Sequence, residues 1–266
     1  KNLELHGPAR AMPRAGARGA ADQPDMLADT ITLAFQDDGV TLQRASLTGQ
    51  ASLKLAGASA RSINASSIDL VMAPDGHTLT TLRANERVVV DLAATATSRA
   101  RTITAASLAA SGDDAHGLTS ARFDGEPVFT EHPDPAPAGA APARPLKGTG
   151  KVLVLKLDGQ LDAIETAEFQ QQAKFESGEA TATGDIARYD EARKVVLFRP
   201  NDREKGRMPQ VENKDIKVDA WSIDLDTESQ NLKASDSVTT QSRSQPGSQS
   251  SGAALFDPSD IVLGRA

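Results

Sequence analysis

The stretch Ala65-Ser66-Ser67-Ile68-Asp69-Leu70, extended by Val71-Met72 and closed by the turn Asp75-Gly76, decides the fold of this chain. Its apolar and polar residues alternate, and a period of two predicts a β-strand with one buried face. Asp-Gly accepts the positive φ angles that a tight hairpin requires. The same alternation recurs at 30–35 and 221–225, whereas long helical patterns are scarce. These segments predict an all-β protein with little helix.

This stretch is one copy of a repeat of the form Ala-x-x-Ile-x-Leu followed by an acidic turn. The copies lie a few tens of residues apart, within the roughly 20–50 residues typical of stacked repeats. Longer polar or Pro-rich stretches separate them, the largest being a Pro-rich insert at 132–146. The pattern predicts folded-over strands with tight turns at one edge and variable loops at the other. The six copies centre on Ile31, Ile68, Leu108, Leu155, Ala187 and Ile223.

Composition excludes several classes of function. The 266 residues carry a net charge of −7 with scattered basic residues, and this is not the basic stripe that nucleic-acid binding requires. The chain contains no cysteine, so disulfides and thiolate metal sites are excluded. Aromatic residues make up only 3%. Because thick cores rely on large aromatic side chains, this composition indicates a thin or elongated body built from aliphatic residues.

No catalytic residue, metal site or cofactor is predicted. The four histidines lack metal-ligand spacing, and neither a Gly-x-Ser-x-Gly elbow nor a phosphate-cradling glycine loop occurs. Alternation sends Asp69 and Asp224 to the outward face. A carbohydrate-active β-helix enzyme is one alternative, and it would require three or more ionisable groups converging in a concave cleft.

Three segments carry a resemblance to a known family. They are Gly184-Asp185-Ile186-Ala187-Arg188-Tyr189-Asp190, the stretch from Val218 to Asp226, and 27–33 with its turn at 37–39. In these the chain resembles the OstA-like family of lipopolysaccharide transport proteins, LptA and LptC, in a multi-repeat or fusion form. The resemblance implies an OstA-like β-jellyroll, a V-shaped, taco-like pair of sheets that stacks end to end with related domains.

The resemblance also implies a function. Acyl chains of lipopolysaccharide would lie against an apolar inner wall in a periplasmic protein, and further partners would be other Lpt-type OstA-like domains, or a second copy, joined edge to edge by strand pairing. The chain opens at Lys1-Asn2-Leu3 as though a strand were already in progress, which indicates a fragment or mature form and leaves open a tether to the inner membrane. The expected inner wall comprises Ile31, Leu33, Phe35, Ile68, Leu70, Met72, Leu108, Phe123, Leu155, Leu157, Phe169, Phe175, Ala187, Tyr189, Ile223 and Leu225.

The expected organisation has three parts. Residues 1–147 form N-terminal OstA-like repeats and residues 148–243 form C-terminal repeats. Residues 244–266 form a linker and the start of a further repeat, because 255–263 again looks like an opening strand. A non-catalytic structural or adhesive β-solenoid would share this fold without a lipid-binding interior, and it remains the second alternative.

Overall fold

The computed structural model describes residues 1–12, 24–55, 61–96, 98–134, 144–159, 161, 163–202, 205–227, 229 and 231–242, together with the backbone of a short strand at 262–264. Every regular element in these ranges is a β-strand. The strands are β1 (Asn2–Ala11), β2 (Asp25–Phe35), β3 (Leu42–Leu55), β4 (Arg61–Met72), β5 (Leu79–Leu92), β6 (Arg101–Asp113), β7 (Gly117–Asp124), β8 (Val128–Glu131), β9 (Leu146–Thr149), β10 (Val152–Gly159), β11 (Ile164–Ser177), β12 (Ala180–Asp190), β13 (Val195–Arg199), β14 (Gln210–Glu212), β15 (Ile216–Asp219), β16 (Ser222–Asp226), β17 (Leu232–Ser235), β18 (Thr239–Ser242) and β19 (Val262–Gly264).

The chain divides into two compact units. Unit 1 comprises residues 1–132 and 154–165, and unit 2 comprises residues 133–153 and 166–266. The boundary expected between residues 147 and 148 therefore lies inside a segment of unit 2. The two units are described separately.

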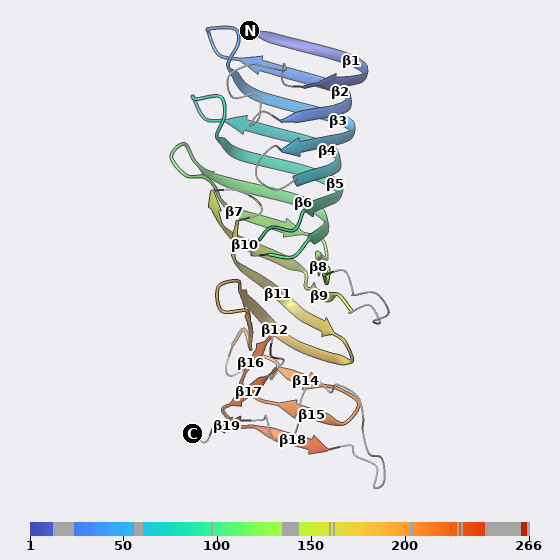
Figure 1. Ribbon diagram of the computed structural model, residues 1–266, viewed down its shortest axis with the longest axis vertical. Helices are drawn as coiled ribbons and strands as arrows, with labels where there is room; N and C mark the ends of the chain where they lie inside the picture. Colours follow the sequence, from blue (N-terminus) through green and yellow to red (C-terminus); the bar gives the residue numbers. More distant parts are fainter. Residues whose placement is uncertain are drawn as a thin grey trace. The chain divides into compact units, whose positions relative to one another are not determined.

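Unit 1 is a stack of antiparallel strands that pair in chain order (Figure 1). From β1 to β6 each strand pairs with its successor, so every connection is a hairpin. β7 then pairs with the second half of β6 and β8 with its first half, and β10 pairs with β7. Each strand can bury only one face alone, and stacking the hairpins makes that face continuous.

A line of β-bulges crosses the strands of unit 1 at mid-length. Between Thr48 and Ala51 of β3 lie two residues, whereas only Ser66 lies between the paired residues of β4. The same two-against-one arrangement recurs where Glu86-Arg87 of β5 oppose Ala106 of β6, and on the β4 side β5 again has one residue more than its partner between the paired positions. Bulges of this kind bend a strand and increase its twist. The line of bulges therefore divides each long strand into two halves.

The bulged residues adopt left-handed backbone conformations. Gly49, Gln50, Glu86 and Arg87 all have positive φ, between 46° and 81°. At Gly49 a glycine is required, because a Cβ there would lie 2.3 Å from a carboxylate oxygen of Asp29. A positive φ costs conformational energy at a residue other than glycine, and the neighbouring strands hold these residues in place.

The bulges explain the repeat motif. In a strand without bulged residues, the two inward-facing residues on either side of the bend are three positions apart in the sequence, as Ala65 and Ile68 are. In a bulged strand these two residues are four positions apart, as Ala84 and Val88 are. The Ala-x-x-Ile of the motif is therefore the passage around the bend. It keeps the buried face on the inside of both halves, whereas strict alternation would turn one half outward.

The tight turns share one local structure. Asp38 accepts hydrogen bonds from the backbone N–H groups of Val40 and Thr41, both at 2.9 Å, and Asp75 does the same for His77 and Thr78. Aspartates at these positions mimic a backbone turn. The hydroxyl of Thr41, with these backbone donors, lowers the pKa of Asp38. Asp113 accepts from the backbone N–H groups of Ala115 and His116 in the same way, and Asp190 and Asp226 each accept from the backbone N–H three residues later.

Unit 2 repeats the bend with shorter strands. β11 pairs with β12, and Gln171-Gln172 bulge against Asp185. The following strands are interrupted at the bend: β13 and β14 cover the two halves of β12, and β16 and β15 cover β13 and β14. β17 and β18 complete the antiparallel pairs, and β19 pairs parallel to β17.

The expected all-β fold is confirmed, and stacked, bent antiparallel hairpins are the arrangement expected of an OstA-like β-jellyroll. One repeat copy needs correction. Gly150 follows Thr149, which pairs with Lys174 next to the bend, so Gly150 occupies the place of Ala65 in its repeat. The residue three positions later is Leu153, and the fourth copy therefore centres on Leu153, two residues before the expected Leu155.

Candidate functional site: an apolar interior with a charged rim

The expected inner wall is buried almost throughout. Fifteen of its sixteen residues are between 0% and 7% exposed, and only Phe35, beside a turn, is half-buried. In unit 1 the wall forms rows across the strands. One row runs Leu5, Ile31, Leu47, Ile68, Ala84, Leu108 and Phe123 in consecutive register, and the next contains Leu33 and Leu70.

A second set of rows lies beyond the bend. Met26, Leu53, Ile63, Val90, Ile103 and Phe129 follow one another across β2 to β8. Residues of both halves, such as Ile31 and Ile63, are fully inaccessible to solvent. Because both faces of an uncovered sheet would be exposed to solvent, the strand halves on the two sides of the bend must cover each other. Unit 1 therefore encloses a continuous apolar interior that runs along the stack.

In unit 2 the corresponding interior is aromatic. Phe169, Ala187, Phe198 and Ile223 form one row. Phe175 lies beyond the bend, and its ring contacts Phe169 edge-on at 4.9 Å and Phe198 at 5.7 Å between centroids. Phe198 is fully buried but was absent from the expected wall, although Val196 and Phe198 share the inward parity of their strand.

The outward aspartates Asp69 and Asp224 are not simply exposed to solvent. Asp69 accepts a hydrogen bond from Ser46 and lies 3.5 Å from Arg44. Asp224 is half-buried, and one of its carboxylate oxygens is inaccessible with no hydrogen-bond partner among the described residues. Both lie on the outward face as expected, but Asp224 is covered more than alternation alone indicates.

Unit 1 has a cleft of about 480 Å³ where strands β3 to β6 reach the edge opposite the Asp turns. Its lining combines aliphatic and charged residues. Leu55, Leu92, Ala93 and Ala100 supply apolar surface, and the ionisable lining residues are Lys54, Arg61, Asp91, Arg101 and His132. Sequence reasoning missed this site, although Arg61 shares the parity of Ile63 and Arg101 that of Ile103.

The charged groups of this cleft do not form an activated nucleophile. The hydroxyl of Thr102 donates to Asp91 at 3.0 Å and lies 3.1 Å from His132 Nε2. A hydroxyl has one proton, so Nε2 must be the donor in the second contact. His132 therefore does not act as a base toward Thr102 in this arrangement. Several ionisable groups do converge here, contrary to expectation, but cations predominate, which suits anion binding.

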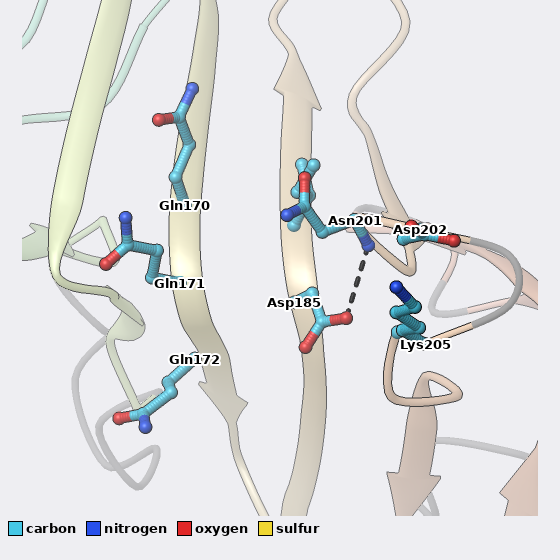
Figure 2. Close-up of a pocket in the computed structure, with 9 residues that line it drawn as sticks. Gln170, Gln171, Gln172, Asp185, Asn201, Asp202 and Lys205 are labelled. Carbon is cyan, nitrogen blue, oxygen red and sulfur yellow. Dashed lines mark hydrogen bonds between the residues drawn. The ribbon is translucent and has the colours of Figure 1, made fainter.

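Unit 2 has a polar cleft of about 580 Å³ on the outer side of its bend. Figure 2 shows Gln170, Gln171 and Gln172 along one strand, and Asp185 on the neighbouring strand with its side chain directed toward Asn201 and Lys205. Residues 200–202 and 205–209, between the strands β13 and β14 that pair with the two halves of β12, lie where a bulge pair stands in the other repeats. Asp185 holds them by accepting hydrogen bonds from the backbone N–H groups of Asn201 at 3.2 Å and Arg207 at 2.8 Å.

Neither metal chemistry nor a membrane helix is evident in the described ranges. No group of three or more His, Cys, Asp or Glu side chains in them is placed to hold a metal ion. No helix long and apolar enough to cross a membrane occurs in the part of the chain that the structure describes.

This geometry defines a class of protein: bent stacks of antiparallel strands around an apolar interior. No family model matches the sequence, and no curated protein matches it. Among solved structures the chain is similar to LptH from Pseudomonas aeruginosa, described as the LptA-homologous periplasmic component of the conserved lipopolysaccharide transport device. That match has 19% identity, covers 59% of this chain and 92% of that chain, and gives a TM-score of 0.38. The fold is defined by the strand pairing described above.

Proposed function

We propose that this chain is a non-catalytic periplasmic component of lipopolysaccharide transport that sheathes acyl chains in its apolar interior. The observation that carries the proposal is the set of aligned apolar rows in unit 1. The row that contains Ile68 runs from strand to strand through apolar residues only, with no charged residue in it. An acyl chain lying along such a row would meet apolar surface throughout.

The energetics suit a carrier. Each buried methylene contributes about 0.8 kcal/mol, so an acyl chain of about twelve carbons gains roughly 10 kcal/mol in gross terms. The interior is packed in the structure, so binding must part the two halves, and that cost lowers the net affinity. Hydrophobic contact is non-directional, which lets a lipid slide from one repeat to the next.

Partners would join at the strand edges. β1 lies at the end of unit 1 and pairs with β2 (Figure 1), and unpaired strand edges are templates for further pairing. Its inward Leu3 is 45% exposed, whereas the inward residues of β3 and β4 are buried. A second OstA-like domain, or another copy of this chain, would extend the sheet and cover Leu3.

A purely structural stack is the second candidate. The observation that favours it is the complete burial of wall residues such as Ile68 and Ile223, because a stack without a ligand needs a closed core. The two candidates differ only in whether the interior admits lipid.

Photo-crosslinking separates the two candidates. A photoreactive amino acid is placed at Ile68, Leu155 or Ile223 and, as matched outward controls, at Asp69 or Asp224, and each purified variant is irradiated with lipopolysaccharide. The proposal predicts adducts from the three inward positions and none from the outward pair. Equal labelling of both sets, or none from either, would leave the structural stack as the better account.

A further inference from the structure

Two adjacent repeats of unit 1 depart from the others at one inward position. Seven residues before each repeat centre lies the last inward residue before the strand edge. Four repeats place an apolar residue there, whereas the second and third place Arg61 and Arg101. These two arginines belong to matching sequences, Arg61-Ser62-Ile63-Asn64-Ala65 and Arg101-Thr102-Ile103-Thr104-Ala105. The apolar residues of the other four repeats are Pro24, Leu146, Ala180 and Ile216.

Both arginines are buried at the rim of the apolar interior. Arg61 is 6% and Arg101 3% exposed, an unusual degree of burial for charged side chains. Register places them in the row Leu55, Arg61, Leu92, Arg101 and Glu131. One strand separates β4 from β6, so the two arginines lie roughly 10 Å apart along the edge. The rim therefore carries cationic side chains in front of an apolar interior.

The ion pair beside Arg101 leaves the rim cationic. Glu131 accepts from Arg101 Nε at 3.1 Å and Nη2 at 3.0 Å, and the guanidinium lies 5.8 Å from the centre of the Phe129 ring. Asp91, the acidic lining residue, accepts hydrogen bonds from Thr102 and Ser62. Among the residues that line the cleft, Lys54, Arg61 and Arg101 carry positive charge and Asp91 carries negative charge.

We infer that the Arg61–Arg101 rim binds the phosphate head group of an acylated lipid whose chain enters the interior past Leu55, Leu92, Ala93 and Ala100. Guanidinium groups bind phosphate bidentately, and such charge-assisted bonds are strong where water is partly excluded. The cleft of about 480 Å³ has the two surfaces that an anionic amphiphile presents, charge at the mouth and aliphatic wall behind. The inference rests on the proposed function and adds where the head group is held.

Three probes test the site on the full chain by isothermal titration calorimetry. They are dodecyl phosphate below its micellar concentration, the uncharged octaethylene glycol monododecyl ether, and inorganic phosphate. Dodecyl phosphate should bind with about tenfold higher affinity than the uncharged ether. One charge-assisted hydrogen bond is enough to give a ratio of this size. Arg61→Gln should remove most of this preference. Arg83→Gln, which removes an exposed cation from the outer face of β5, should leave it unchanged.

A second variant is expected to gain affinity, a result that misfolding cannot produce. Glu131→Gln removes the carboxylate that competes for Arg101, so dodecyl phosphate should bind about tenfold tighter, while the ether binds as before. Equal binding of the phosphate and the ether in wild type, or inorganic phosphate binding as tightly as dodecyl phosphate, would overturn the head-group site and leave acyl binding intact. If neither amphiphile binds, the proposed function itself fails.

Discussion

Truncating Ile68 to alanine tests whether the interior is a packed core in the absence of lipid. Ile68 is fully buried in the central row of unit 1, between Leu47 and Ala84. The three carbons removed are worth about 0.8 kcal/mol each, or roughly 2.4 kcal/mol together. The cavity left behind raises the expected loss of unfolding free energy to about 3–4 kcal/mol, inside the range of about 2–5 kcal/mol for such truncations.

Urea unfolding followed by circular dichroism measures this loss. With a slope of about 2 kcal/mol per molar urea, the midpoint should fall by about 1.5–2 M. Ser67→Ala, on the opposite face one residue earlier, is the matched control and should change the free energy by no more than about 0.5 kcal/mol. A cost for Ile68→Ala no greater than that of the control would mean that the halves stand apart, and the closed interior described here would be wrong.

The remaining predictions concern the turns, the bend and the edge. The Thr41 hydroxyl and the turn amides lower the pKa of Asp38, so its contribution to stability is present above an unfolded pKa of about 4 and is lost as pH falls through the lower folded value. Asp38→Asn should flatten the acid side of a urea-midpoint profile, and an unchanged profile would refute this. Gly49→Ala should cost roughly 1–3 kcal/mol more than Gly178→Ala in urea unfolding, because only the first meets a neighbouring atom within 4 Å; equal costs would contradict a fixed bend. Glu4→Pro should weaken concentration-dependent association in sedimentation velocity without unfolding β1, because hydrogen bonding of Lys1 with Phe35 places the Glu4 N–H on the free edge. Association as strong as wild type would argue against this edge.

Much of the fold follows from local sequence. Period-two alternation predicted the strands, and Asp-Gly predicted their turns, because both depend on residues close in the chain. The inward parity of Ile68 and Leu70 predicted their burial. The bend was harder to predict, since Ala65-Ser66-Ser67-Ile68 breaks the period by one residue, and only pairing with a bulged neighbour gives that break a structural meaning.

The rim of the candidate site was missed for a different reason. Arg61 and Arg101 share the inward parity of their strands, but a charged residue suggests solvent, and their burial depends on partners distant in sequence. Glu131, which pairs with Arg101, lies on β8, a strand that sequence patterns did not single out. Phe198 was missed because its strand lies outside the repeat motif. Parity applied to every strand would have indicated Arg61, Arg101, Glu131 and Phe198.

The central claim is that acyl chains enter the interior, and isoleucine methyl NMR tests it on the unmodified chain. Ile31, Ile63, Ile68 and Ile103 report from inside unit 1, and the half-buried Ile186 reports from the outer cleft of unit 2. A lipid with a nitroxide on its acyl chain is titrated in, and paramagnetic broadening of each methyl signal is measured. The account predicts strong broadening of the interior methyls and little at Ile186. Broadening of Ile186 as strong as that of the interior methyls, or none at any position with saturating lipid, would contradict it.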